Sequence, residues 1–135
     1  MPRIHITAMD HIVLNVADID RSLDFYVKVL GLKGERVDEF RSGKVGFPSV
    51  RINEATIIDL FPAEEKTAAV DKNNGNLNHF CLVVEGADFP AAVEELTRNH
   101  IAIRQGPVSR WGARGQATSV YFLDPDGNEI EIRAY

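Results

Sequence analysis

The chain carries the stretch His11-Ile12-Val13-Leu14-Asn15-Val16 and repeats its pattern in His79-Phe80-Cys81-Leu82-Val83-Val84. Apolar residues recur at every second position of both stretches, which is typical of a strand with one buried face. Each stretch opens with a histidine. A carboxylate lies on a later predicted strand of each half, Asp59 in the first and Glu131 in the second. We therefore interpret the chain as two copies of one module, with a matched histidine and carboxylate in each.

The turn and cap signals around these stretches repeat the same order of elements. Asp18 and Asp88 are predicted helix N-caps, and Gly31 and the pair Asn99-His100 are predicted helix ends. Asp124-Pro125-Asp126-Gly127 predicts a rigid turn, because proline presets its own φ and glycine accepts a positive φ. The remaining predicted strands cover residues 33–40, 44–52, 55–61, 101–104, 116–123 and 128–134.

These elements predict an α+β fold of two paired βαβββ modules. Module one spans about residues 5–61, a polar linker spans 62–78, and module two spans about 79–135. One module of roughly 60 residues would be only marginally stable alone. We therefore expect the two modules to pack as a single domain over residues 1–135.

Composition indicates an ordinary soluble domain. The 135 residues are 44% hydrophobic and 26% charged, and the formal net charge of −5 argues against a nucleic-acid partner. One cysteine, Cys81, excludes an internal disulfide and fits a reducing compartment. The sequence shows neither a secretory signal after Met1 nor a run long enough to span a membrane. We expect a cytoplasmic protein that binds a small molecule and no membrane.

The phase of the strands places the repeated polar residues on one face. Successive strand residues point to opposite faces, so His11, Asp59, His79 and Glu131 all point away from the apolar face that the helices cover. Imidazole and carboxylate without thiolate suit a divalent Mn, Fe, Co, Ni or Zn ion. Two histidines and one carboxylate leave positions open for substrate, while a second carboxylate serves as a fourth ligand or as a base. Glu131 and Asp59 are accordingly the predicted catalytic residues.

Four segments resemble the vicinal oxygen chelate superfamily, which includes glyoxalase I, extradiol dioxygenases, fosfomycin resistance proteins and metal-free bleomycin resistance proteins. They are residues 10–16, 21–26, 29–32 and, above all, 119–131. The resemblance implies a cupped mixed sheet around a central cavity, a homodimer, and a metal held by His11, His79 and Glu131. The fourth ligand, a glutamate in glyoxalase I, falls on Asp59. Residues 106–115 also resemble the loop of a poorly characterised glyoxalase-domain branch, some members of which are called virulence proteins.

Three further residues are candidates for substrate binding. Arg110 and Arg114 lie in the glycine-flanked segment 106–115 and suit an anionic substrate group, although such a segment is also typical of an exposed hairpin connection. Tyr121 is either a proton or hydrogen-bond donor in the site or a packed strand aromatic. Cys81 shares the phase of His79, but we interpret it as a small core residue.

Three functional hypotheses follow from these residues. The first is a metal-dependent lyase, isomerase or transferase of the glyoxalase or fosfomycin resistance type. The second is an extradiol-type dioxygenase that uses His11, His79 and Glu131 as a facial triad for Fe²⁺. The third is a resistance protein that binds a small molecule without turnover. The substrate, the native metal, and the choice between a site within one chain and a site across a dimer stay open at this level.

Overall fold

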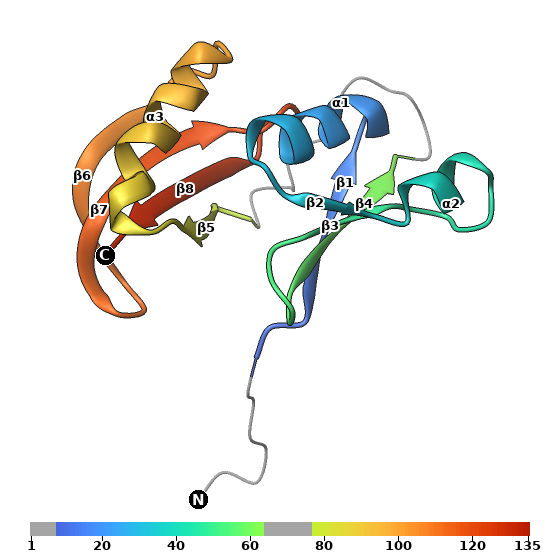
Figure 1. Ribbon diagram of the computed structural model, residues 1–135, viewed down its shortest axis with the longest axis horizontal. Coiled ribbons are helices and arrows are strands. Elements are labelled where there is room, and N and C mark those ends of the chain that lie inside the picture. Colours follow the sequence, from blue (N-terminus) through green and yellow to red (C-terminus); the bar gives the residue numbers. More distant parts are fainter. Residues whose placement is uncertain (1–7, 64–76) are drawn as a thin grey trace, which may run out of the picture. The chain divides into compact units, whose positions relative to one another are not determined.

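The structure is a computed structural model that describes residues 8–63 and 77–135. The chain divides into two compact units, residues 1–68 and 69–135. Each unit contains one four-stranded mixed sheet with few helices (Figure 1). This confirms the predicted α+β class. Most of the linker predicted over residues 62–78, and the first residues of module one, predicted to begin at about residue 5, lie outside the described residues.

Unit 1 has the strand order β1-β4-β3-β2, in which β1 and β4 are parallel and the other pairs are antiparallel. One helical segment follows β1 and continues from an α-helix into a π-helical turn. The elements are β1 (His11–Val16), α1 (Ile19–Leu23), η1 (Asp24–Val29), β2 (Lys33–Glu35), α2 (Val37–Arg41), β3 (Ser49–Arg51) and β4 (Ile57–Pro62).

Unit 2 has the strand order β5-β8-β7-β6, again with a parallel pair, β5 and β8, and antiparallel partners beyond it. The order is that of unit 1, so the repeat predicted from the two histidine stretches is present in the topology. The elements are β5 (Phe80–Val83), η3 (Gly86–Asp88), α3 (Phe89–Arg98), β6 (Gln105–Gly112), β7 (Gly115–Leu123) and β8 (Glu129–Ala134).

The strand predicted over residues 33–40 is wrong in its second half. Strand β2 ends at Glu35, Arg36 adopts a left-handed conformation with φ of 57°, and α2 begins at Val37. Two acidic residues, Asp38 and Glu39, lie in the first turn of α2, where the helix dipole favours negative charge. Local helix-end chemistry therefore outweighs the alternating pattern in this segment.

The strand predicted over residues 101–104 is also wrong, because β6 begins later, at Gln105, and replaces much of the predicted loop 106–115. Partly buried and exposed residues alternate along β6, which pairs with β7 across a tight turn at residues 113–114. Gly106 has a φ of 104° and lies where the register shifts, and a Cβ there would approach the Ser119 carbonyl oxygen to 2.4 Å. The glycines that suggested a loop thus permit a bulged strand.

Each unit buries apolar side chains on the sheet face opposite its histidine and carboxylate. In unit 1 the rings of Phe25 and Tyr26 meet edge to face with centroids 5.1 Å apart. No helix among the described residues is long and apolar enough to cross a membrane. The buried apolar residues are Leu14, Val16, Leu23, Phe25, Tyr26, Val50, Ile58 and Leu60 in unit 1, and Leu96, Val120, Tyr121, Phe122, Ile130, Ile132 and Ala134 in unit 2. Tyr121 is an exception in its position, since it lies opposite Glu131.

The two predicted helix caps differ, and they provide a matched test. Asp18 accepts a hydrogen bond from the Arg21 backbone N–H at 3.0 Å, whereas Asp88 makes no side-chain capping bond. We expect Asp18→Ala to lower the free energy of unfolding by about 0.5–2 kcal/mol, since it leaves a helix-end donor without its partner. Urea unfolding of both variants measures the difference. An equal loss in Asp88→Ala would contradict a capping role for Asp18.

Candidate functional site

Unit 1 brings His11 and Asp59 together on the sheet face away from α1. Asp59 lies opposite Val13 of β1 and opposite Ser49 of β3. The residue is 7% exposed, and its Oδ1 accepts a hydrogen bond from Ser49 Oγ at 2.6 Å. Its Oδ2 lies 3.9 Å from His11 Nε2. The predicted strand phase puts His11 and Asp59 on the same face, and the register between β1 and β4 brings them next to each other.

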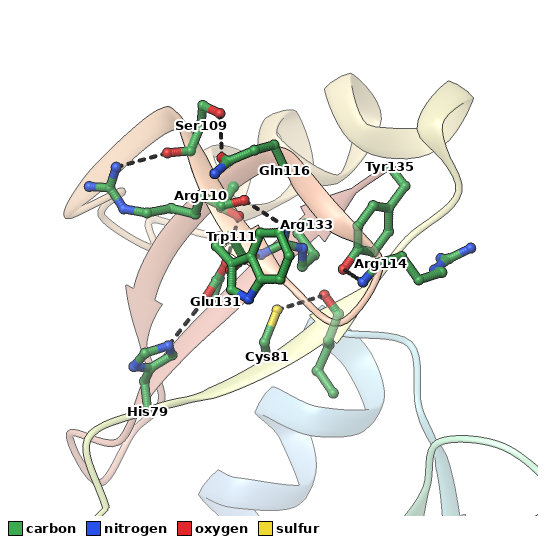
Figure 2. Close-up of polar contacts among 12 residues, drawn as sticks. His79, Cys81, Ser109, Arg110, Trp111, Arg114, Gln116, Glu131, Arg133 and Tyr135 are labelled. Atoms are coloured by element: carbon green, nitrogen blue, oxygen red, sulfur yellow. Dashed lines mark hydrogen bonds and ion pairs between the residues drawn. The ribbon is translucent and has the colours of Figure 1, made fainter.

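Unit 2 brings His79 and Glu131 together in the equivalent position (Figure 2). Glu131 lies opposite Cys81, two residues after His79, just as Asp59 lies opposite Val13, two residues after His11. Glu131 is 4% exposed, and its Oε1 lies 3.1 Å from His79 Nε2. Its Oε2 accepts hydrogen bonds from Ser119 Oγ at 2.5 Å and Arg133 Nη1 at 3.1 Å.

Each histidine is oriented by the residue that precedes it. His11 Nδ1 lies 2.7 Å from Asp10 Oδ2, and His79 Nδ1 lies 2.6 Å from Asn78 Oδ1. An oxygen acceptor at Nδ1 favours a proton on that nitrogen, so in the neutral ring Nε2 carries the lone pair that a metal requires. Sequence reasoning missed Asp10 and Asn78, although the repetition of an Asx residue before each histidine is a signal that could have revealed them.

The surroundings shift the pKa values of His11 and Glu131 in opposite directions. The hydrogen bond that His11 donates to Asp10 raises the pKa of His11, and the charge of Asp59 acts in the same direction. Burial opposes ionisation of Glu131, but hydrogen bonds from Ser119 and Tyr121, with the charge of Arg133, outweigh it and lower the pKa of Glu131. An ionised carboxylate is the form that coordinates a cation.

Cys81 is exposed, so its interpretation as a core residue is wrong. Partial burial and the nearby charge of Glu131 raise the pKa of Cys81 to about 11. The thiol is therefore protonated at neutral pH and is neither a nucleophile nor a thiolate ligand in the metal-free protein.

The three predicted substrate-binding residues lie in different surroundings. Tyr121 is buried directly opposite Glu131, and its ring meets that of His79 edge to face at 5.6 Å. Burial raises the pKa of Tyr121, as does Glu131, while Arg110 acts in the opposite direction. Arg110 and Glu131 therefore both influence the Tyr121 hydroxyl. The Arg114 guanidinium lies instead over the ring of Tyr135, 4.2 Å from its centroid.

The four predicted ligands therefore form two pairs, one in each unit. Within residues 8–63 and 77–135, no three His, Cys, Asp or Glu side chains are grouped so as to hold a metal ion. Each pair contributes one imidazole nitrogen and one carboxylate oxygen, a donor set that suits the first-row divalent ions named above. Among the described residues, each pair by itself supplies two protein ligands.

Known proteins resemble this chain in sequence and structure. Virulence protein STM3117 of Salmonella typhimurium strain LT2 is 31% identical over 131 residues, which cover 96% of this chain and 85% of that protein. A lactoylglutathione lyase of Escherichia coli O157:H7 is 33% identical over 130 residues, which cover 90% of this chain and 88% of that protein. An integron cassette protein from the mobile metagenome of V. cholerae has a TM-score of 0.78 and 32% identity, with 98% of each chain covered.

A family model covers almost the whole chain. The model for the glyoxalase/bleomycin resistance protein/dioxygenase superfamily matches residues 8–132, which include all four predicted ligands. The match confirms the resemblance that residues 10–16 and 119–131 indicated, and the similarity to a virulence protein fits the predicted branch. The chain belongs to the glyoxalase/bleomycin resistance protein/dioxygenase superfamily.

Proposed function

We propose that the protein is a divalent-metal-dependent enzyme that acts on a small oxygen-bearing substrate, as a glyoxalase I-like lyase or isomerase or a related transferase. His11, His79 and Glu131 hold one ion per site, a divalent Zn, Ni, Mn, Co or Fe ion. One observation carries the proposal: in both units the histidine turns Nε2 toward a nearly buried carboxylate while Nδ1 faces an Asx oxygen.

Asp59 and Glu131 are the two carboxylates of the proposed site, and they have different roles. When bound, the ion supplies Lewis acidity to two oxygens of the substrate. Asp59 uses Oδ1 to accept the Ser49 hydrogen bond, so Oδ2 is the oxygen that accepts a substrate proton or becomes a fourth ligand. Glu131 serves chiefly as a ligand, since its Oε2 already accepts two hydrogen bonds and only Oε1 faces His79.

The substrate contacts come from the face of unit 2 that carries Glu131. Tyr121 is next to His79 and donates a hydrogen bond to Glu131; in the proposed site its hydroxyl would donate instead to a substrate oxygen. Arg110 adds a positive charge beside Tyr121 and suits an anionic substrate group. Arg114, stacked on Tyr135, would contact such a group farther along the hairpin.

Similarity to a lactoylglutathione lyase supports lyase or isomerase chemistry over the alternatives. The dioxygenase alternative uses the same three ligands as an Fe²⁺ triad, and oxygen uptake with catechols after anaerobic iron loading tests it. In the binding alternative the protein holds its guest without turnover.

We further propose a cytoplasmic homodimer, and light scattering of the purified protein measures the number of chains.

The decisive experiment is elemental analysis of the wild-type protein purified without chelator, followed by titration with each first-row divalent ion. We expect one ion per site, and conversion of a hemithioacetal after loading with Ni²⁺ or Zn²⁺. Removal of the ion by a chelator should abolish turnover, and adding the ion back should restore it. Protein that binds none of these ions would contradict the proposal, and protein that binds an ion and a guest without turnover would favour the binding alternative.

A further inference from the structure

Arg133 is buried beside Glu131 and also holds the β6–β7 hairpin (Figure 2). It is 3% exposed. Its Nη1 donates to Glu131 Oε2 at 3.1 Å and to the Trp111 carbonyl oxygen at 3.2 Å. Its Nη2 donates to the carbonyl oxygens of Arg110 and Gly115 at 2.8 and 3.0 Å. One guanidinium therefore links the candidate ligand to three backbone carbonyls of the hairpin.

The hairpin has no room for a side chain where this guanidinium lies. A Cβ on Gly112 would lie 2.4 Å from Arg133 Cζ and 2.7 Å from both terminal nitrogens. The Tyr135 ring covers the guanidinium, with its centroid 4.8 Å from Cζ. Glycine at position 112 thus leaves the space that the Arg133 guanidinium fills.

Burial of an arginine is unfavourable unless its charge is paired and its donors are satisfied. Arg133 Nε has no hydrogen-bond partner among the residues that the structure describes, so the side chain is not fully satisfied there even by four acceptors. A charged side chain is not needed to hold a hairpin against a sheet, because packed apolar side chains can stabilise the same contact. The feature that does require a charge is the adjacent carboxylate of Glu131.

Unit 1 provides an internal comparison for this carboxylate. Phe61 follows Asp59 by two residues on β4, as Arg133 follows Glu131 by two residues on β8. The Asp59 oxygen that accepts from Ser49 has a neutral donor, whereas Glu131 Oε2 has both a neutral donor, Ser119, and a cationic one. The two modules share a histidine and a carboxylate but differ in this cationic donor to the carboxylate.

We propose that Arg133 is a positioning residue that, together with Ser119, occupies Oε2 of Glu131 and so presents Oε1 alone beside His79 Nε2. This inference rests on the proposed function, in which Glu131 and His79 share an ion. Glu131 is then a ligand through one oxygen, held in one rotamer, and the hairpin that carries Arg110 is tied to that ligand. Partners that orient a ligand typically change metal affinity by about 10–100-fold when they are removed.

The test measures the affinity and the visible absorption spectrum of Co²⁺ bound to the full chain. We expect Arg133→Met to bind Co²⁺ about 10–100-fold more weakly, with a changed spectrum because the freed Oε2 becomes available as an additional donor. Arg133→Lys retains a charge beside Oε2 and should recover part of the affinity. Arg98→Met is the matched control, because Arg98 pairs with Glu94 and Glu95 on exposed α3 and should leave both readouts unchanged.

A second variant covers the case in which Arg133→Met does not fold. Gly112→Ala retains Arg133 and Glu131 but displaces the guanidinium, and it should weaken Co²⁺ binding in the same direction. Gly46→Ala is its control, because a Cβ there meets no atom within 4 Å. Folded Arg133 or Gly112 variants with wild-type Co²⁺ affinity and spectrum would overturn the positioning role. Wild-type protein that binds no Co²⁺ or any other first-row ion would instead overturn the proposed function.

Discussion

His79→Ala should bind divalent metal more weakly than the wild-type protein by more than about 100-fold, since loss of a ligand exceeds the usual cost of losing a supporting partner. The imidazole of His79 is oriented by Asn78, and its Nε2 lies 3.1 Å from Glu131 Oε1. Isothermal titration with Zn²⁺ and with Co²⁺ measures the loss. His11→Ala should have an effect of the same order, because the proposed site draws one imidazole from each unit.

The matched control for this result is His100→Asn. His100 lies after α3 with a φ of 62°, a conformation that asparagine tolerates well. This variant should therefore fold and keep wild-type metal affinity and turnover. An unchanged affinity in His79→Ala, or an equal loss in His100→Asn, would show that the ion binds elsewhere on the chain.

Phe122→Ala should lower the free energy of unfolding by about 3–5 kcal/mol, which is typical for truncation of a buried phenylalanine. Phe122 is 0% exposed and lies opposite Ile130 in the β7–β8 pair. Its neighbour Tyr121 points to the other face, next to His79. Folded proteins are stable by only about 5–15 kcal/mol, so the variant should lose a large fraction of its stability. Urea unfolding followed by circular dichroism measures the change.

Trp111→Ala serves as the control for aromatic truncation. Trp111 is 76% exposed, and only its backbone carbonyl takes part in the Arg133 network. Its side chain should therefore contribute less than about 0.5 kcal/mol. A loss near that of Phe122→Ala would indicate that the indole is covered in solution. A loss below about 1 kcal/mol in Phe122→Ala would contradict the assignment of Phe122 to the core.

Local chemistry explains which parts of the fold were predictable. Gly127 has a φ of 83°, as the turn sequence predicted. Asp124 also accepts hydrogen bonds from the backbone N–H groups of Asp126 and Asn128, which the sequence analysis did not predict. Both interactions join residues at most four apart in the chain. The second half of the predicted strand 33–40 was wrong because another local effect, the start of α2 at Val37, outweighs the alternating pattern. The predicted strand 101–104 was wrong because pairing with β7, distant in the sequence, places β6 at Gln105–Gly112.

The candidate site divides in the same way. Strand alternation was sufficient to predict that each module turns its histidine and its carboxylate to one face, and the pairs His11 with Asp59 and His79 with Glu131 lie together as that alternation requires. Alternation does not specify which oxygen of a carboxylate is occupied, or by which donor. The sequence did not reveal the roles of three donors to these carboxylates, Ser49, Ser119 and Arg133. The two serines reach their carboxylates from a neighbouring strand. Arg133 lies on the same strand as Glu131, but its burial depends on the β6–β7 hairpin.

The amino-acid sequence alone therefore determined the repeat, the family and the face on which the polar residues lie, because side-chain alternation and turn chemistry act over a few residues. Tertiary structure alone decided that Arg133 is buried, that Gly112 leaves space for it, and that Glu131 keeps one oxygen available beside His79. Those contacts join residues as much as 52 positions apart, and only sheet register brings them within hydrogen-bonding distance.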